Sequence, residues 1–283
     1  MTTLIDYLSF TVPVNMTNLK PTSDVSLIAH NALAEHAGIF WQHIYGKLEF
    51  IARHGRGSYR YGFESDPVGF YVWFGPRADT VLVECTGQGC EWLRQHRLLD
   101  NLIMKIRHRC TRIDVATDLM TGCTPSEFVD QGYSKRFRSH GFQTSETGET
   151  HYVGSRTSDR YAKVYRYAPP HPRAKFLRVE HTFKKDYAKV AAKVLDTEGV
   201  LTLANMAGAT WEWESKIWKE TMKTESKLPG YKHETKQGKT LRWLITQVAP
   251  SFKKLVREGT IEDPLTFIQQ YFLDEVISTE SEK

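Results

Sequence analysis

Residues 111–118 read Thr-Arg-Ile-Asp-Val-Ala-Thr-Asp, a stretch in which polar and apolar side chains alternate. Alternation with a period of two predicts a β-strand, because successive side chains point to opposite faces of a sheet. One face of this strand would carry Arg112, Asp114 and Asp118, and the other would carry β-branched apolar residues. The stretch therefore predicts a sheet with charged residues along one face.

Two segments downstream repeat this pattern. Residues 150–167 and 175–184 are expected to be strands joined by the turn Ala-Pro-Pro-His-Pro-Arg. Their polar faces would carry Tyr161, Lys163, Tyr165, Tyr167, Arg178 and Glu180. If the three polar faces meet, carboxylates, a lysine and tyrosine hydroxyls converge, which suits metal-assisted transfer of a phosphoryl group to a tyrosine. The alternative is a solvated polar sheet face, which periodicity by itself favours.

The segments around these strands alternate between strand and helix patterns. Strands are expected at 4–14 and in an antiparallel meander over 48–84. Helices are expected at 24–38, as one helix over 90–110, and as a short helix with a capping box that begins at Thr124. The polar, glycine-containing stretch 135–150 is interpreted as a mobile loop.

Beyond residue 186, glycine is scarce and apolar residues recur every three or four positions, so this region is expected to be wholly helical. The fold class is thus α+β. It comprises an antiparallel-sheet domain with packed helices over residues 1–185, followed by an all-helical C-terminal region over residues 186–283.

Composition narrows the class of protein. The chain has 283 residues, of which 40% are hydrophobic and 25% charged, so disordered and fibrous chains are excluded. A net charge of +5 permits a polyanionic partner without requiring one. Four cysteines without a C-x-x-C pair indicate reduced thiols. No signal peptide or membrane span is recognised, so we expect a cytoplasmic protein without a membrane partner.

Five segments, taken in order, carry a resemblance to a known family. They are DYLSFTV (6–12), VECTGQGCEWL (83–93), RIDVATD (112–118), HYVGSRTSDRYAKVYR (151–166) and RVEHTFKKD (178–186). Over roughly residues 4–190 the chain resembles the replication initiation factor family. This family comprises the Rep_trans initiators of rolling-circle plasmids and the related initiators of filamentous phages. The specific part of the match is the Y-x-G-S-R-x-S block, followed by a strand that ends in tyrosine.

The resemblance implies an enzyme, a metal-dependent endonuclease that nicks and transfers DNA strands, with residues 1–185 as its catalytic nicking domain. Members nick one strand of supercoiled origin DNA through a tyrosine, stay joined to the 5′ phosphate and leave a 3′ hydroxyl for a polymerase. By motif position this tyrosine is Tyr165, with Tyr161 and Tyr167 as alternatives. The family usually has Asn or Asp and then Lys after that tyrosine, whereas Arg166 and Tyr167 follow here, so the choice among the three tyrosines stays open.

The resemblance also implies an acidic site for Mg²⁺ or Mn²⁺, with Asp114 and Glu180 as the preferred ligands. Asp118 is held in reserve, because four residues along a regular strand span roughly 13 Å, too far for Asp114 and Asp118 to bind one ion directly. The sequence contains no H-x-H pair that would bind the metal instead. Arg156 and Lys163 are candidates to contact the scissile phosphate, or else they are exposed ion-pair partners.

Basic residues interleaved with aromatic ones predict contacts with DNA. The candidates are Arg56, Arg60, Arg136, Arg138, Lys232 and Lys236. By resemblance, the partners are double-stranded origin DNA and single-stranded DNA, with a host helicase and a homodimer as further expectations. The C-terminal helices would either recognise DNA or mediate dimerisation.

A different class of function stays open, namely a non-catalytic DNA-binding regulator of a mobile element with the same fold. A tyrosine recombinase is disfavoured, because its tyrosine would stand on a helical domain and not on a strand. Lone histidines in the matching motifs are more often structural than catalytic, and the tryptophans are more often core than stacking platforms. These residues are His151, His181, Trp211, Trp213 and Trp218.

Overall fold

The computed structural model describes residues 1–14, 30–35, 41, 44, 47–66, 68–75, 79–146, 148–223, 226–229, 244, 248–261 and 263–268. The chain divides into two compact units, Met1–Tyr231 and Lys232–Lys283. The first unit contains the sheet and the candidate site. The described residues of the second unit include the helices α9 (Ala249–Arg257) and α10 (Pro264–Ile268).

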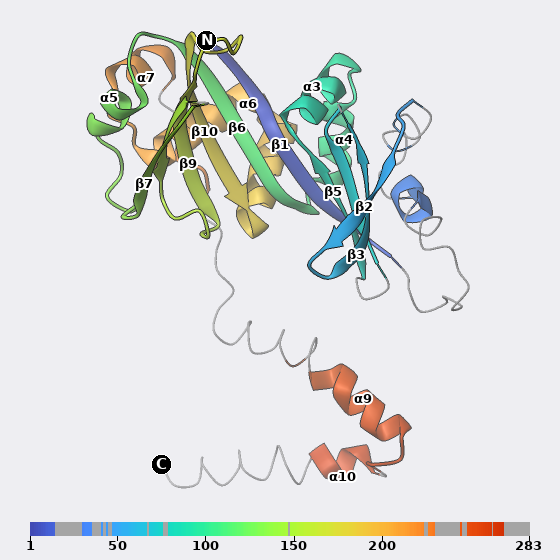
Figure 1. The fold of residues 1–283 in the computed structure, drawn as a ribbon. Coiled ribbons are helices and arrows are strands. Elements are labelled where there is room, and N and C mark those ends of the chain that lie inside the picture. The colour runs from blue at the N-terminus through green and yellow to red at the C-terminus, as the bar shows by residue number, and fades with distance from the viewer. Residues whose placement is uncertain are drawn as a thin grey trace, which may run out of the picture. The chain divides into compact units, whose positions relative to one another are not determined.

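A ten-stranded sheet dominates the first unit, in the order β2-β3-β4-β5-β1-β6-β10-β9-β8-β7 (Figure 1). Its strands are β1 (Thr2–Pro13), β2 (Ile51–Arg56), β3 (Tyr59–Ser65), β4 (Phe70–Phe74), β5 (Thr80–Cys85), β6 (Cys110–Met120), β7 (His140–Ser145), β8 (Gly148–Val153), β9 (Arg160–Tyr167) and β10 (Phe176–Lys184). Neighbouring strands pair antiparallel throughout. The predicted α+β class and the meander over β2–β5 are confirmed.

Helices cover the apolar face of this sheet. Helix α6 (Lys185–Trp211) contacts β6, β10 and β1, and Figure 1 shows it behind β6 and β10. Its Ala188, Ala191 and Ala192 are fully buried, and such small side chains let a helix approach strands closely. Helix α4 (Leu99–Ile106) packs on α6. The charged residues of the strands therefore gather on the other face.

A β-bulge interrupts the central strand pair. Ile5 of β1 pairs with Val115 and Tyr7 pairs with Asp114, so Asp6 is the extra residue of β1. Beyond the bulge, Tyr7 and the odd-numbered residues that follow share the polar face with Asp114. The alternation over residues 4–14 predicts the strand but not this change of register.

The stretch 90–110 is not one helix, and that prediction is wrong. Helix α3 (Gly87–Gln95) ends before Arg97, whose φ of 57° is left-handed, and α4 begins at Leu99. The Leu98 amide donates back to the Leu93 carbonyl at 2.9 Å, which closes the end of a helix. The apolar spacing continues across this break, so spacing did not reveal it.

The loop predicted at 135–150 and the single strand predicted at 150–167 are also wrong. Strands β7 and β8 form a hairpin, and a turn over residues 154–159 separates β8 from β9. Gly148 and Gly154 have φ values of 136° and 92°, which favour glycine. The side chains of β7 are mostly exposed at the edge of the sheet. An exposed edge strand can be as polar as a loop, and for this reason the polar composition of residues 135–150 wrongly predicted a loop.

The helical pattern after residue 186 is confirmed in α6, α7 (Lys216–Thr221), α9 and α10. Because α6 packs on the sheet, the compact unit continues to Tyr231, and the division of roles at residue 185 stays a prediction. Of the helix predicted at 24–38, residues 30–35 are helical and the others lie outside the described residues.

Three smaller expectations concern local features. Helix α5 (Pro125–Asp130) carries the predicted capping box, in which Thr124 and Glu127 bond each other's backbone amides. The four cysteines are free thiols. No helix among the described residues is long and apolar enough to cross a membrane.

His181 lies on the apolar face beside Trp211, Trp213 and Trp218, all of which are buried. The Trp213 indole N–H donates to His181 Nε2 at 2.8 Å. Burial lowers the pKa of His181 from its ordinary 6.5 to about 3. His181 is therefore a neutral, structural hydrogen-bond acceptor in the core.

We expect the protonation of His181 to lower the free energy of unfolding as the pH falls. The unfolded chain binds a proton at this residue near pH 6.5, whereas the folded chain does so only near pH 3. Its contribution to the free energy of unfolding thus falls as the pH falls through this window, by up to about 1.4 kcal/mol per pH unit. Urea unfolding should show a steeper loss for the wild type than for His181→Gln, and parallel curves would contradict this.

Candidate active site

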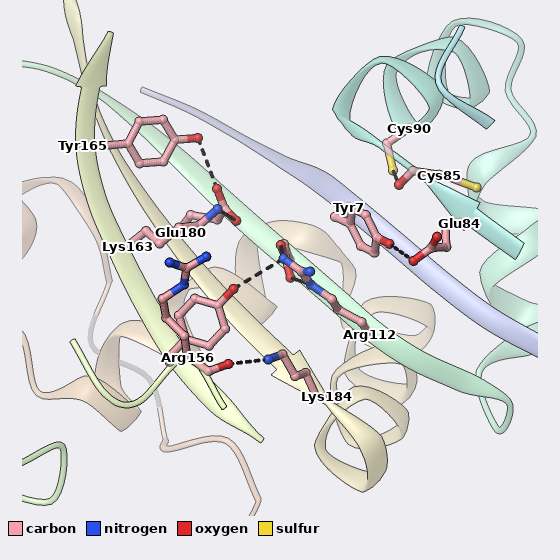
Figure 2. Close-up of polar contacts among 12 residues, drawn as sticks. Tyr7, Glu84, Cys85, Cys90, Arg112, Arg156, Lys163, Tyr165, Glu180 and Lys184 are labelled. Carbon is pink, nitrogen blue, oxygen red and sulfur yellow. Dashed lines mark hydrogen bonds and ion pairs between the residues drawn. The ribbon is translucent and has the colours of Figure 1, made fainter. Parts of the chain in front are cut away.

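The three polar strands lie side by side in the sheet. Glu180 of β10 pairs with Lys163 of β9, and Arg178 of β10 pairs with Tyr165 of β9 and Asp118 of β6. Side chains at paired positions of neighbouring strands share one face. Carboxylates, a lysine and a tyrosine hydroxyl therefore meet, as Figure 2 shows for Glu180, Lys163 and Tyr165.

Tyr165, Lys163 and Glu180 form one contact network. The Tyr165 hydroxyl donates to Glu180 Oε2 at 3.1 Å, and Lys163 Nζ lies 2.6 Å from Glu180 Oε1. Burial first, and the charge of Glu180 second, raise the pKa of Tyr165 far above its ordinary value. Ionisation of this tyrosine during a reaction thus requires a proton acceptor and a nearby cation. Glu180 and Lys163 are placed to act in these two ways.

Asp114 is a buried neighbour of Glu180, and each residue is only 1% exposed. Burial, and then repulsion from Asp114, raise the pKa of Glu180 well above its ordinary value, so Glu180 accepts a proton more readily than an exposed glutamate. Arg112 Nε donates to Asp114 Oδ1 at 2.9 Å and compensates that charge. The two carboxylates are thus held together by surrounding cations.

The two buried carboxylates fit the implied divalent ion. Mg²⁺ and Mn²⁺ prefer hard oxygen ligands, and Mg²⁺ sites commonly combine one or two protein carboxylates with phosphates of the substrate. Asp114 and Glu180 offer such oxygens, and a cation would relieve their repulsion. Within the described part of the chain, no group of three or more His, Cys, Asp or Glu side chains is arranged around a common point for a metal. Substrate oxygens would have to complete the coordination.

Asp118 is engaged elsewhere. Arg178 Nε donates to one Asp118 oxygen at 2.6 Å, and an Arg178 terminal nitrogen donates to the other at 2.8 Å. A second terminal nitrogen of Arg178 donates to Asp6 Oδ1 at 2.8 Å. Asp118 would bind a metal only if this ion pair opened, so its role as a ligand stays a prediction.

Cations gather around Tyr161, next to the Tyr165 network. An Arg112 nitrogen lies 3.5 Å from the Tyr161 hydroxyl, and Lys184 Nζ lies 4.9 Å from the centre of the Tyr161 ring. Lys184 donates to the Arg156 carbonyl at 2.6 Å, as Figure 2 shows, and the Arg156 guanidinium lies 4.9 Å from the centre of the Tyr152 ring. Burial first, and Arg112 second, lower the pKa of Lys184. Crowded cations of this kind are stabilised by an anion such as a phosphate.

Comparison with known proteins identifies a solved structure with a similar fold. No protein-family model matches the sequence, and no curated protein matches it. Among solved structures, the rolling circle replication initiator protein from Geobacillus stearothermophilus matches with a TM-score of 0.57 at 18% sequence identity. That match covers 80% of this chain and 99% of the initiator. The chain shares the fold of a rolling-circle replication initiator.

At this identity the likeness concerns the fold and not the activity. A match to DynU16, a protein of the dynemicin biosynthetic locus, has a TM-score of 0.20 at 13% identity and supports no argument. It covers 70% of this chain and 97% of DynU16. A proposed reaction must therefore rest on the contacts among the described residues of this chain.

On this initiator-like fold, the predicted DNA-contact residues fall in different places. Arg56 lies 2.8 Å from Glu84 Oε2 and 5.8 Å from the Trp73 ring, and Arg60 lies 5.6 Å from the Tyr61 ring. Arg136 and Arg138 are exposed in the segment before β7, and Lys232 and Lys236 lie outside the described residues. The structure thus brings none of the described four into the Tyr165 network.

Sequence reasoning missed several members of the polar face. Tyr7 donates to Glu84, and the Arg112 guanidinium lies 4.4 Å from the centre of the Tyr7 ring. Asp6 and Lys184 were also missed as site residues. Asp6, Tyr7, Glu84 and Lys184 all lie inside the matching segments, so the resemblance was the available signal. Their partners are distant in sequence, which periodicity cannot reveal.

His151 lies outside the Tyr165 network. Its Nε2 is 3.0 Å from Ser126 Oγ and 3.1 Å from Glu149 Oε1. Ser126 and Glu149 contact the same ring nitrogen, so this group does not form a relay in which a carboxylate orients the opposite nitrogen of the ring. The contacts instead join α5 to β8, in agreement with a structural role.

Proposed function

We propose that the chain is a rolling-circle replication initiator of a plasmid or phage, which nicks and rejoins one strand of origin DNA through a covalent 5′-phosphotyrosine at Tyr165. The observation that carries the proposal is the bond from the Tyr165 hydroxyl to Glu180, a buried carboxylate already paired with Lys163. A nucleophile, an acceptor for its proton and a cation thus lie in one network. The likeness of fold supports the same reading.

In this mechanism the tyrosine oxygen attacks phosphorus while its proton passes to Glu180. The bond between phosphorus and the 3′ oxygen breaks, and the 3′ oxygen takes a proton from solvent water to become a hydroxyl. Lys163 stabilises the negative charge that develops on the tyrosine oxygen. Rejoining reverses these steps, because the phosphotyrosine retains the energy of the phosphodiester.

Asp114 and Glu180 would hold a Mg²⁺ or Mn²⁺ ion. When bound, the ion would polarise an oxygen of the scissile phosphate. Glu180 has one oxygen near Tyr165 and the other near Lys163, so proton transfer uses a defined atom of the carboxylate. Arg156 would contact the DNA phosphates next to the scissile bond, together with Lys184.

Lys184→Ala is expected to weaken DNA binding several-fold at moderate salt, because it removes one cation from the group around Tyr161. The slope of log affinity against log salt should fall by about one. Lys189→Ala, on the exposed surface of α6, is the control and should have little effect. Equal effects of the two substitutions on affinity and slope would contradict a specific phosphate contact at Lys184.

A non-catalytic DNA-binding regulator is the second candidate. The observation that favours it is that cations already compensate both proposed metal ligands, Arg112 for Asp114 and Lys163 for Glu180. A polar face that only binds DNA needs no further ion. In either case the expected partners are double-stranded origin DNA and single-stranded DNA, with a helicase, a second copy of the chain and a cytoplasmic location as further expectations.

The deciding experiment incubates the protein with negatively supercoiled plasmid that carries its own replicon, with Mn²⁺ or with EDTA. Protein joined to a 5′ end in Mn²⁺, lost in EDTA and mapped to a peptide with Tyr165, is the expected result. An adduct at Tyr161 or Tyr167 would keep the function and correct the site. Tight binding to the same DNA without an adduct would favour the regulator.

A further inference from the structure

A cleft of about 620 Å³ opens on the polar face beside the tyrosines. Its volume lies within the roughly 300 to 1,000 Å³ that small-molecule sites occupy. Its walls come from β1, β4, the first turn of α3, β10, the end of β9 and the segment after it. Strands β4 and β9 stand five places apart in the sheet and would be roughly 24 Å apart if it were flat. Both contribute a tyrosine to this cleft, so the polar face is concave here.

Aromatic rings are the first feature of this cleft. Tyr167 stacks on His171, with ring centres 3.8 Å apart and planes 17° apart. Tyr71 of β4 also lines the cleft. The Tyr167 hydroxyl lies 3.5 Å from the Tyr165 hydroxyl, so the cleft adjoins the proposed nucleophile. Flat rings at the edge of such a site are suited to stacking on an unpaired base.

Carboxylates are the second feature. Asp6, Asp66 and Glu91 line the cleft, against the guanidinium groups of Arg173 and Arg178. Asp6 is paired with Arg178, and Glu91 is paired with Arg94 of its own helix at 2.6 Å. Asp66 is therefore the lining carboxylate that can accept a hydrogen bond from an amino group of a ligand. Cytosine, adenine and guanine carry such a group, and thymine does not.

Close packing fixes the wall that α3 contributes. A Cβ at Gly87 would lie 3.0 Å from Asp6 Oδ1, and one at Gly89 would lie 2.8 Å from the Gly69 carbonyl. The glycines therefore let the first turn of α3 approach β1 and the turn before β4. This explains the Gly-Gln-Gly sequence as a requirement of the cleft wall.

From these features we infer that the cleft binds one unpaired nucleobase of single-stranded DNA next to the scissile phosphate, stacks it on Tyr167 and His171, and favours bases with an amino group. The inference rests on the proposed function for the position of the scissile phosphate. The binding of an unpaired base is measured independently of nicking.

The first test uses binding of short single-stranded oligonucleotides by fluorescence anisotropy. Oligo-dC of about ten nucleotides should bind the full chain about tenfold more tightly than oligo-dT. His171→Ala should weaken binding to both, and Asp66→Asn should reduce the preference for dC. The exposed residues His140 and Asp79 lie outside the lining, so His140→Ala and Asp79→Asn are matched controls that should change neither.

The second test is photo-crosslinking with a single 5-iodocytosine in the same oligonucleotide, followed by peptide mapping. Crosslinks to Tyr167, His171 or Tyr71 are expected. Crosslinks confined to other regions, or an affinity that neither cleft variant changes, would overturn the inference even if the Tyr165 adduct forms. Crosslinks in the cleft without any adduct would support the base site while removing the nicking function.

Discussion

Tyr165→Phe is expected to abolish the covalent DNA adduct and lower nicking by more than about a thousandfold. The substitution removes only the hydroxyl that donates to Glu180 and leaves the ring in place. Glu180 keeps its ion pair with Lys163, so the free energy of unfolding should change by no more than about 1 kcal/mol. Adduct formation on supercoiled origin DNA and urea unfolding measure the two effects separately.

Tyr161→Phe and Tyr167→Phe are the matched controls for this prediction. Tyr161 lies 3.5 Å from Arg112, and Tyr167 is the stacked partner of His171, so neither hydroxyl donates to Glu180. Both variants should keep the adduct, although their affinity for DNA can fall. An adduct that survives in Tyr165→Phe and disappears in Tyr167→Phe would transfer the role of nucleophile to Tyr167.

Arg178→Met is expected to destabilise the fold by about 3–5 kcal/mol. Arg178 is 2% exposed and donates to both oxygens of Asp118 and to Asp6. Methionine fills much of the space but leaves two carboxylates without their cation in a buried setting. The midpoint of urea unfolding should therefore fall strongly.

Lys219→Met provides the control for an exposed ion pair. Lys219 pairs with Glu214, more than half of each side chain is exposed, and such pairs contribute about 0–1 kcal/mol. Adding Asp118→Asn to Arg178→Met should restore part of the lost stability, because one uncompensated charge is removed. A loss below about 1 kcal/mol for Arg178→Met would show that water or other cations already compensate Asp118 and Asp6.

Strand periodicity predicted the part of the site that depends on local alternation. It placed Tyr165, Lys163 and Glu180 on polar faces, and the antiparallel register then brought them together. Periodicity gave wrong predictions where the alternation of polar and apolar side chains is missing or does not change at the end of an element. The edge strand β7 is mostly exposed and mostly polar, and the left-handed Arg97 interrupts a pattern of apolar residues that continues beyond it.

Long-range partners could not be predicted from the sequence. Asp6 and Arg178 are 172 positions apart, and their contact depends on the neighbouring places of β1, β6 and β10 in the sheet. The same holds for Tyr7 and Glu84, which meet because β1 lies between β5 and β6. The pairing of strands, and not the properties of single residues, determines these contacts.

The extra residue Asp6 reverses the alternation of β1: odd-numbered residues face the core before it, and even-numbered residues face the core after it. Residues 2–5 pair only with β6 among the described strands, and Ile5 lies in the core at 4% exposure. Deleting Asp6 would restore unbroken alternation while keeping Ile5 in the core and Tyr7 on the polar face, because their partners Val115 and Asp114 are adjacent in β6. The extra residue therefore serves the polar face: it places two consecutive side chains of β1 there, Asp6 against Arg178 and Tyr7 against Glu84. A single-codon deletion at this position would leave the strand paired but would remove one of the two carboxylates that Arg178 binds.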